Sequence, residues 1–338
     1  MTARHPHHKR FRHEALLYAG AADFVASVTP FLQEGIAANE PILVVESPQK
    51  IDLLQNALGA DAERVMFADM GQVGSNPARI IPAWDDFVKR FGDHGPLRGI
   101  GEPIWSGRPD DELAESQRHE ALLNVAFGHG QPWWLLCPYD TSQMDEPVIE
   151  EAMRSHEFVM EGGRSQRSKT FVGIDASGAP FAAGMEDPPA GVRQLAFTAD
   201  TLLNLRGEAA RFGLHNGMPA GRTALFVTAL NEVATNSILH GGGSGTLRLW
   251  RQGGKVIAEV HDAGLFVHPL ADRHAPQAGS IDARGLWVTN QLCDLVQIRR
   301  VADGTVFRLH VKIDPAHARL SVIDAQPDSG SVEGGAQG

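Results

Sequence analysis

Five apolar runs in the first half of the chain are each followed by a segment in which apolar residues recur at helical spacing. This alternation constrains the fold more than any other feature, because repeated strand–helix units imply a mostly parallel sheet with helices on both faces. We therefore predict an α/β domain in this half. The expected strands are residues 15–18, 41–45, 65–67, 97–100 and 133–137, and the expected helices are residues 21–38, 50–58, 77–91, 112–127 and 147–154.

The composition bounds the class of protein. With 338 residues the chain is long enough for about two domains, and its formal net charge of −11 argues against direct binding to nucleic acid. No apolar run approaches the roughly 18 residues that cross a bilayer, and the basic residues 1–10 lack the apolar core of a signal peptide. Cys137 and Cys293 lie far apart and indicate no disulfide framework. We expect a cytoplasmic protein that does not insert into a membrane.

Ligands of parallel α/β sheets usually bind at the carboxyl ends of the strands. The turn at residues 18–24 has neither the glycine pattern nor the lysine of a phosphate-binding loop, so we expect a small-molecule pocket there and no nucleotide. Trp105, Trp133 and Trp134 can line such a pocket or can simply fill the core. The strand-end candidates are Tyr18, Gly20, Glu46, Ser47, Asp69, Gly101, Glu102 and Asp140.

Two His-Glu pairs, His13-Glu14 and His119-Glu120, and the thiol of Cys137 carry the kinds of side chain that bind metal ions. If they cluster, they form a plausible metal site. No short ligand spacing such as His-x-x-x-His accompanies them, and nothing in the sequence brings them together. The histidines within residues 5–13 can likewise bind a metal ion or belong to a solvated arm. The alternatives stay open for both groups.

Four motifs stand out in the first half: Phe11-Arg-His-Glu-Ala-Leu-Leu-Tyr18, Gly101-Glu-Pro-Ile-Trp105, Glu120-Ala-Leu-Leu-Asn124 and Cys137-Pro-Tyr-Asp140. Together they resemble the MEDS family of sensory domains (the methanogen/methylotroph sensory type) over residues 11–160. The resemblance implies a relative of the RecA-like fold that does not bind nucleotide, a signal-receiving role and an unidentified small-molecule signal.

A polar segment rich in turn residues separates the two halves. Residues 161–169 are polar and contain glycine, residues 175–178 indicate a turn, and residues 187–191 contain two prolines. We place a linker at residues 161–192 and a second domain at residues 193–314. Residues 315–338 are rich in Gly, Ser and Asp, and we expect them to be a disordered tail.

The second half combines helices with hairpins. A run of glycines at residues 241–245 ends its longest helix, and two pairs of alternating strands follow. The expected helices are residues 198–212, 219–240 and 284–293, and the expected strands are residues 246–250, 255–260, 295–301 and 305–313.

Three polar residues of the long helix, Glu232, Asn236 and His240, recur one turn apart and share a face. Asn offers a neutral oxygen to Mg²⁺, and Glu can order or deprotonate a nucleophile, so the pair suits phosphate chemistry. The alternatives are a polar face turned to water and, for His240, a cap on helix-end carbonyls. The apolar residues expected on the opposite face are Leu225, Val233 and Leu239.

Polar and glycine residues at later segment ends suit a nucleotide. Asp262 follows a strand and can accept the amine of adenine, while Gly264 lets the base approach, and Thr305 can complete the contact. The amides that open the helix at Arg284 can bind phosphate, and we expect residues 265–282 to form a lid over the nucleotide.

The order of these motifs resembles the GHKL superfamily of ATPases and kinases (gyrase, histidine kinase and MutL types) over residues 195–313. Within it the closest resemblance is to the anti-sigma-factor serine kinases. It implies an α/β sandwich with a mixed sheet under helices. The implied roles are general base for Glu232, Mg²⁺ ligand for Asn236, adenine binding for Asp262 and Gly264 with support from Thr305, and phosphate binding for Arg284, Gly285 and Leu286.

Two departures from the family pattern affect the nucleotide. Phe266 stands where the family has a second glycine, and Asp282-Ala283 precedes the phosphate motif, with Gly279 displaced. An aspartate beside a triphosphate repels it, so ATP binding is expected to be weak or to need a partner.

Two functions of different classes compete. In the first, the sensor governs a kinase that binds Mg-ATP and phosphorylates Ser/Thr of a STAS-type anti-sigma-factor antagonist, with a sigma factor as a further partner and a homodimer suggested by the family. In the second, the domain is a non-catalytic or weakly ATP-binding regulator that works by binding partners. A metabolic α/β enzyme in the first half is disfavoured, because no nucleophile–base set stands out.

Overall fold

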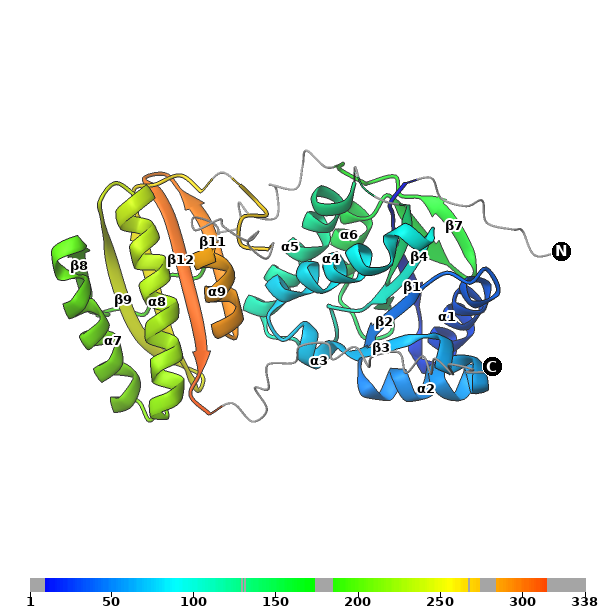
Figure 1. Ribbon diagram of the computed structural model, residues 1–338, viewed down its shortest axis with the longest axis horizontal. Helices are drawn as coiled ribbons and strands as arrows, with labels where there is room; N and C mark the ends of the chain where they lie inside the picture. The colour runs from blue at the N-terminus through cyan, green and yellow to red at the C-terminus, as the bar shows by residue number, and fades with distance from the viewer. Residues whose placement is uncertain are drawn as a thin grey trace, which may run out of the picture.

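The computed structural model describes residues 10–128, 130, 132–173, 185–266, 268–273 and 284–314. Two domains lie side by side along the long axis, with α5 (Asp110–Phe127) and α9 (Arg284–Leu292) at their junction (Figure 1). The predicted tail, the middle of the linker, much of the expected lid, and Gly279, Asp282 and Ala283 lie outside the described residues.

The N-terminal domain is built on a seven-stranded sheet in the order β3-β2-β4-β5-β1-β6-β7. β1 lies between β5 and β6 and pairs with both in parallel, whereas β7 at the edge is antiparallel to β6. The strands are β1 (Arg12–Tyr18), β2 (Ile42–Glu46), β3 (Met66–Asp69), β4 (Leu97–Gly101), β5 (Trp133–Asp140), β6 (Phe158–Glu161) and β7 (Arg164–Arg167).

Both faces of this sheet are covered by helices, because its central strands are apolar on both sides. In β1, Ala15 and Leu17 belong to one buried cluster, while Leu16 and Tyr18 belong to the other. The predicted α/β fold with helices on both faces is thus confirmed. The first cluster contacts α3 (Met70–Val73), α4 (Ile80–Phe91), α5 and α6 (Glu146–Ser155), and the second contacts α1 (Gly20–Ala37) and α2 (Pro48–Leu58).

The structure decides between the two predicted roles of the tryptophans, lining a pocket or filling the core. Trp133 and Trp134 are buried on opposite faces of the sheet, so core filling holds for both of them. Trp105 is 36% exposed, and the guanidinium carbon of Arg108 lies 4.1 Å from its ring centroid. Of the three, only Trp105 can present a face to a ligand from outside.

The N-terminal sheet extends past residue 160, where the sequence placed the linker. β6 pairs with β1 and β7 pairs with β6 across a turn at Gly162 and Gly163, both of which have positive φ. The Ser165 hydroxyl of β7 donates to Glu14, which also accepts from Arg12. β6 is only four residues long and β7 has no apolar residue, which is why the sequence pattern did not reveal them.

The C-terminal domain has a five-stranded sheet in the order β11-β12-β10-β9-β8. Each pair in it is antiparallel, so the mixed sheet that the resemblance implied is wrong for the strands described here. β8, at one edge, was not predicted as a strand. The strands are β8 (Gln194–Thr198), β9 (Ser244–Gln252), β10 (Lys255–Asp262), β11 (Leu295–Val301) and β12 (Gly304–Lys312).

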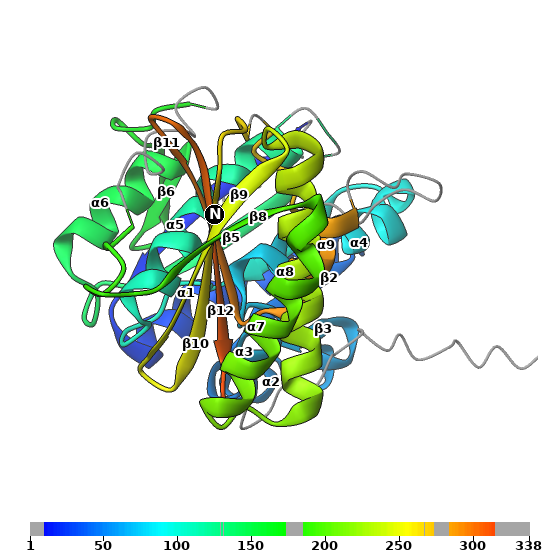
Figure 2. The same ribbon diagram turned by 90° about the vertical axis from the view of Figure 1, so that its left-hand side faces the viewer.

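Helices α7 (Leu202–His215), α8 (Ala220–His240) and α9 cover one face of this sheet (Figure 2). Val233 of α8 is buried among them, as predicted, but Leu225 and Leu239 are 42% and 67% exposed. The predicted apolar face was wrong at these two positions, because Leu225 and Leu239 are each two turns from Glu232 and so lie on its side of α8, away from the face that buries Phe226, Leu230 and Val233.

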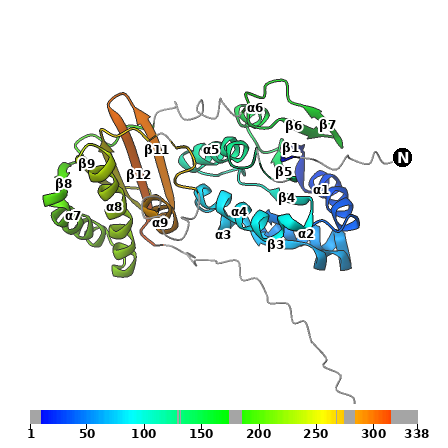
Figure 3. The ribbon, with the colours of Figure 1, turned by 45° about the horizontal axis from the view of Figure 1, so that its top comes forward.

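The other face of the C-terminal sheet meets α5 of the N-terminal domain (Figure 3). There Oε1 of Glu115 lies 2.6 Å from Nη1 of Arg299, and Oε2 lies 3.6 Å from Nη2 of Arg273. Nearby, Nζ of Lys255 donates to Oδ2 of Asp111 over 3.1 Å. Ion pairs between α5 and the sheet therefore hold the domains together. No helix among the described residues is long and apolar enough to cross a bilayer.

Candidate nucleotide site and the comparisons with known proteins

Helix α8 presents Glu232 and Asn236 toward the first turn of α9. Both side chains are half-buried. A Cβ placed on Gly285 would lie 3.0 Å from Oε2 of Glu232 and 3.3 Å from Nδ2 of Asn236. Because Gly285 has no side chain, the carboxylate of Glu232 and the carboxamide of Asn236 can both lie against the first turn of α9.

Asp262 stands at the end of β10 and is fixed by two donors. Its Oδ2 accepts from the hydroxyl of Ser237, over 2.5 Å, and its Oδ1 accepts from the backbone N–H of Gly264, over 2.9 Å. Ser237 follows Asn236 on α8, so this hydrogen bond ties the strand end to the helix that carries Glu232. Sequence reasoning missed Ser237, because a serine in a helix gives no signal of a partner twenty-five residues away.

Two further glycines, Gly241 and Gly304, make room for Asp262. A Cβ on Gly241 would lie 2.5 Å from Cγ of Asp262, and one on Gly304 would lie 1.8 Å from its backbone oxygen. Gly304 also has a φ of +149°, which other residues rarely adopt. The helix end and the β11–β12 turn can approach the aspartate only because both positions lack a side chain.

Thr305 is adjacent to Asp262 across the β10–β12 ladder and is buried. Its hydroxyl donates to the carbonyl oxygen of Gly264 over 2.7 Å and accepts from the N–H of Phe266 over 3.1 Å. Here it holds the loop after Asp262 and has no hydrogen left to donate to a base. The ring of Phe266 packs edge-on against Phe307, so the residue that replaces the family's glycine joins the core.

The remaining candidates predicted from the sequence differ in how far they are buried. Arg284 is exposed, Gly285 is buried, and Leu286 packs against the core with its side chain. Of the groups on Leu286, only the backbone N–H is therefore suited to bind a phosphate. His240 is exposed at the end of α8 and does not share the half-buried setting of Glu232. The structure thus brings Glu232 and Asn236 beside Gly285 and joins Asp262 to the same helix through Ser237, whereas His240 lies apart; the roles of these residues stay predictions.

The C-terminus of α9 is held by the N-terminal domain. The 3-10 helix η2 (Pro77–Arg79) reaches it, and Arg79 donates to the carbonyl oxygens of Asn290 and Cys293 over 3.0 and 2.9 Å. Asn76 donates to the carbonyl oxygen of Asn290 over 3.0 Å. A guanidinium at a helix C-terminus satisfies free carbonyls and opposes the helix dipole. One helix therefore links the N-terminal domain to the candidate site.

The predicted ligand edge of the N-terminal sheet is occupied by its own side chains. The hydroxyl of Tyr18 donates to Glu102 over 3.0 Å, and Lys50 contacts both. Burial, followed by the charge of Glu102, raises the pKa of Glu46 well above its usual value. Among the other candidates, Ser47 and Asp69 cap helices, and Asp140 accepts from the N–H of Gly20.

A cavity of about 560 Å³ lies between α5 and the outer face of the C-terminal sheet. Among the described residues, none of the nucleotide candidates lines it, so it is separate from the site on α8 and α9. Its walls include Asp111, Glu186, Lys255, Gln297, Arg299 and His310.

Comparisons with known proteins agree with this architecture. Residues 12–157 match the family model described as the MEthanogen/methylotroph, DcmR Sensory domain (MEDS), and residues 195–311 match the model of the histidine kinase-like ATPase domain. The chain joins a MEDS domain to a histidine kinase-like ATPase domain. Both family resemblances predicted from the sequence are confirmed. The MEDS match spans strands β1 to β5 of the seven-stranded sheet, and the ATPase match contains Glu232, Asn236 and Asp262.

Single relatives add little to these two matches. No curated protein matches the chain. A crystal structure of the RsbU and RsbW domains of Rv1364c from Mycobacterium tuberculosis is 18% identical, and the match covers 62% of this chain and 49% of that chain. The chain thus spans about half of that structure's length, and a TM-score of 0.27 supports no inference about fold or function.

A first prediction concerns Gly285→Ala in the ATPase domain. The added methyl would displace Glu232 and Asn236, and we expect the affinity for Mg-ATP to fall at least about tenfold. The displaced atoms are ends of flexible side chains and alanine favours helix, so the free energy of unfolding should not fall by more than about 1 kcal/mol. The matched control is Gly221→Ala on α8, where nothing lies within 4 Å of an added Cβ. Titration calorimetry and urea unfolding separate the two effects; equal affinities for both variants would contradict the geometry.

Proposed function

We propose that the protein is a signal-responsive regulator whose ATPase domain binds Mg-ATP and phosphorylates Ser/Thr of an anti-sigma-factor antagonist of the STAS type. The observation that carries the proposal is that Glu232 and Asn236 of α8 flank Gly285 of α9, while Ser237 of the same helix hydrogen-bonds to Asp262 of β10. The match to a histidine kinase-like ATPase domain supports nucleotide binding. The choice of a protein serine or threonine as acceptor, and of a sigma factor as second partner, rests on the motif order in the sequence.

The chain's own groups divide the chemistry of phosphoryl transfer. Asp262, oriented by Ser237 and Gly264, keeps free lone pairs for the exocyclic amine of adenine. Bound Mg²⁺ would neutralise charge on the phosphates, and the amide oxygen of Asn236 would hold it. Glu232, on the same face of α8, would accept the proton of the acceptor hydroxyl.

A sensory role for the MEDS domain is supported by its contacts with the ATPase domain. Arg79 and Asn76 hold the C-terminus of α9, and the N-terminus of α9 lies against Glu232 and Asn236. A small-molecule signal that shifts η2 would move α9 as a unit and thereby alter the phosphate side of the site. This route requires no membrane and no nucleic acid. The two cysteines are free and buried, which fits a cytoplasmic location.

One alternative function has an observation in its favour. Thr305 is committed to the loop after Asp262, and Phe266 replaces a glycine of the adenine motif with a ring that joins the core. A loop held this firmly favours a regulator that binds its partners, a sigma factor among them, and turns over little or no ATP. The two functions differ in whether Mg²⁺ and ATP bind together.

Titration calorimetry of the full chain with ATP, with and without Mg²⁺, tests the proposal. We expect Mg²⁺ to strengthen ATP binding, and Asn236→Ala to remove that gain, a loss of at least about tenfold in affinity. The matched control is Asn231→Ala on the same helix, whose side chain instead accepts from Arg206 over 2.7 Å. Absence of binding heat at high Mg-ATP concentration in the unaltered chain would favour the partner-binding regulator.

A further inference from the structure

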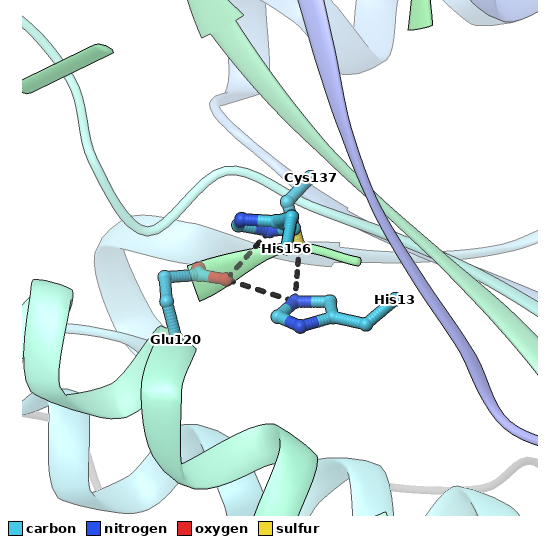
Figure 4. A group of neighbouring side chains, drawn as sticks. All are labelled: His13, Glu120, Cys137 and His156. Carbon is cyan, nitrogen blue, oxygen red and sulfur yellow. Dashed lines mark hydrogen bonds and ion pairs between the residues drawn. The ribbon is translucent and has the colours of Figure 1, made fainter. Parts of the chain in front are cut away.

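The geometry points to a second site: we infer that the MEDS domain binds a zinc ion between His13, Glu120, Cys137 and His156. The four side chains are buried, and one ligand atom from each lies within 4.8 Å of all the others. They come from β1, α5, β5 and the residue that follows α6. Figure 4 shows the imidazoles, the carboxylate and the sulfur converging on a common centre.

The other ring nitrogen of each histidine is fixed as a donor. Nδ1 of His13 lies 3.2 Å from Oδ1 of Asn124, whose amide nitrogen donates to the carbonyl oxygen of Ser155 over 2.7 Å. Nδ1 of His156 lies 2.8 Å from the carbonyl oxygen of Ala152, which can only accept. In its neutral form each ring therefore carries its proton on Nδ1 and turns an unprotonated Nε2 toward the centre.

These two unprotonated nitrogens face a carboxylate. Nε2 of His13 and Nε2 of His156 lie 3.0 and 3.2 Å from the same oxygen of Glu120, Oε2. Nε2 of His156 makes no hydrogen bond there, and Oε1 of Glu120 is buried without a hydrogen-bond partner among the described residues. Lone pairs directed at a buried carboxylate repel it, and charging both rings, whose centroids are 3.9 Å apart, would place two cations in contact. A metal cation at the centre removes both conflicts.

The donor set selects the metal. Two imidazole nitrogens, one sulfur and one carboxylate oxygen form a four-coordinate set of the kind that zinc prefers. Sγ of Cys137 lies 3.4 Å from Nε2 of His13 and completes the group. On binding, the thiol loses its proton to solvent, and the thiolate and the Glu120 carboxylate together balance the charge of Zn²⁺. A site with four protein ligands leaves no open position, so its role is to organise the domain.

The proposed site includes some of the metal-ligand candidates that the sequence indicated and leaves others out. His13, Glu120 and Cys137 of the predicted set come together, whereas Glu14 turns to Arg12. Glu120 lies on α5, the helix whose earlier turns contact the ATPase domain through ion pairs. An ion held by Glu120 would therefore fix α5 relative to the central strands β1 and β5, beside the interface between the domains.

Cobalt spectroscopy of the full chain tests this inference. The protein is stripped with a chelator, exchanged into metal-free buffer and titrated with Co²⁺ alone and then with Zn²⁺. We expect one tightly bound equivalent with visible bands of tetrahedral Co²⁺ and a thiolate-to-cobalt charge-transfer band, both abolished by one equivalent of Zn²⁺. Absence of the tetrahedral bands or of the charge-transfer band in the unaltered chain would overturn the assignment, whatever the variants do.

Variants then locate the ion. Cys137→Ser should remove the charge-transfer band and weaken Zn²⁺ binding at least about 100-fold. Cys293→Ser, at the chain's other buried cysteine, is the matched control and should retain both. Replacement of His5, His7 and His8 by alanine should also retain both, which excludes the histidine-rich leader as the source of the signal. Retention by Cys137→Ser, or loss in either control, would show that the ion binds elsewhere.

Discussion

Glu232→Gln is expected to lower the rate of phosphotransfer about 100-fold or more while the affinity for Mg-ATP changes little. The amide keeps the shape of the side chain beside Gly285 but cannot accept the proton of an acceptor hydroxyl, and general bases contribute roughly 10²–10⁴ to such rates. Transfer of labelled γ-phosphate to STAS-type proteins of the source organism measures the rate, and titration calorimetry measures the affinity. The contrast between the two readouts identifies a base, because a residue that only shapes the site would affect both.

Glu208→Gln on α7 is the matched control for this variant. The carboxylate of Glu208 lies on a different helix from Glu232, 2.8 Å from Nη2 of Arg211. Its replacement removes the same charge from the domain. We expect the control to transfer phosphate at the rate of the unaltered chain. Loss of transfer and of binding together in Glu232→Gln, or transfer at an unchanged rate, would refute a base role. Absence of transfer in the unaltered chain would favour the partner-binding regulator.

The second large effect is expected from Glu115→Gln at the interface between the domains. The Glu115 side chain is 1% exposed and lies within 2.6 Å of Arg299, 3.6 Å of Arg273 and 3.5 Å of Arg118. Neutralising it removes the carboxylate that pairs with Arg299 and that Arg273 and Arg118 also approach, and breaking a buried ion pair typically costs about 3–5 kcal/mol. We expect the urea midpoint of unfolding to fall accordingly and the two domains to unfold as separate transitions.

The matched control for the interface is Glu150→Gln on α6, an exposed position with the same change of charge. Exposed substitutions of this kind usually alter the free energy of unfolding by no more than about 0.5 kcal/mol. If Glu115→Gln and Glu150→Gln unfold at the same urea concentration, the ion pairs on α5 do not hold the domains together.

Both the candidate nucleotide site and the inferred zinc site are connected to the domain interface by a single helix. α9 carries Gly285 at one end and accepts hydrogen bonds from Arg79 at the other, so it belongs to the candidate site and to the interface at once. α5 connects the inferred zinc site, through Glu120, to the same interface, through Glu115. Two helices therefore connect the domains, and the variants described above alter each of them separately.

Local patterns in the sequence determined most of the architecture. The alternation of apolar runs with segments of helical spacing predicted the parallel sheet, because a continuous apolar run within one segment already indicates a strand that is buried on both faces. The spacing of Glu232 and Asn236 placed them on one face of α8 for the same reason. Gly-rich residues 241–245 ended that helix where the structure ends it. Such features need no knowledge of distant contacts.

The tertiary structure decided which distant residues meet. β1 lies between β5 and β6, and this strand order is what brings His13 beside Cys137 and adds His156, which no local pattern marks. The hydrogen bond from Ser237 joined α8 to Asp262, twenty-five residues away. The physical reason is that periodicity specifies how a segment is buried, whereas its partner is chosen by the energy of the whole packed core.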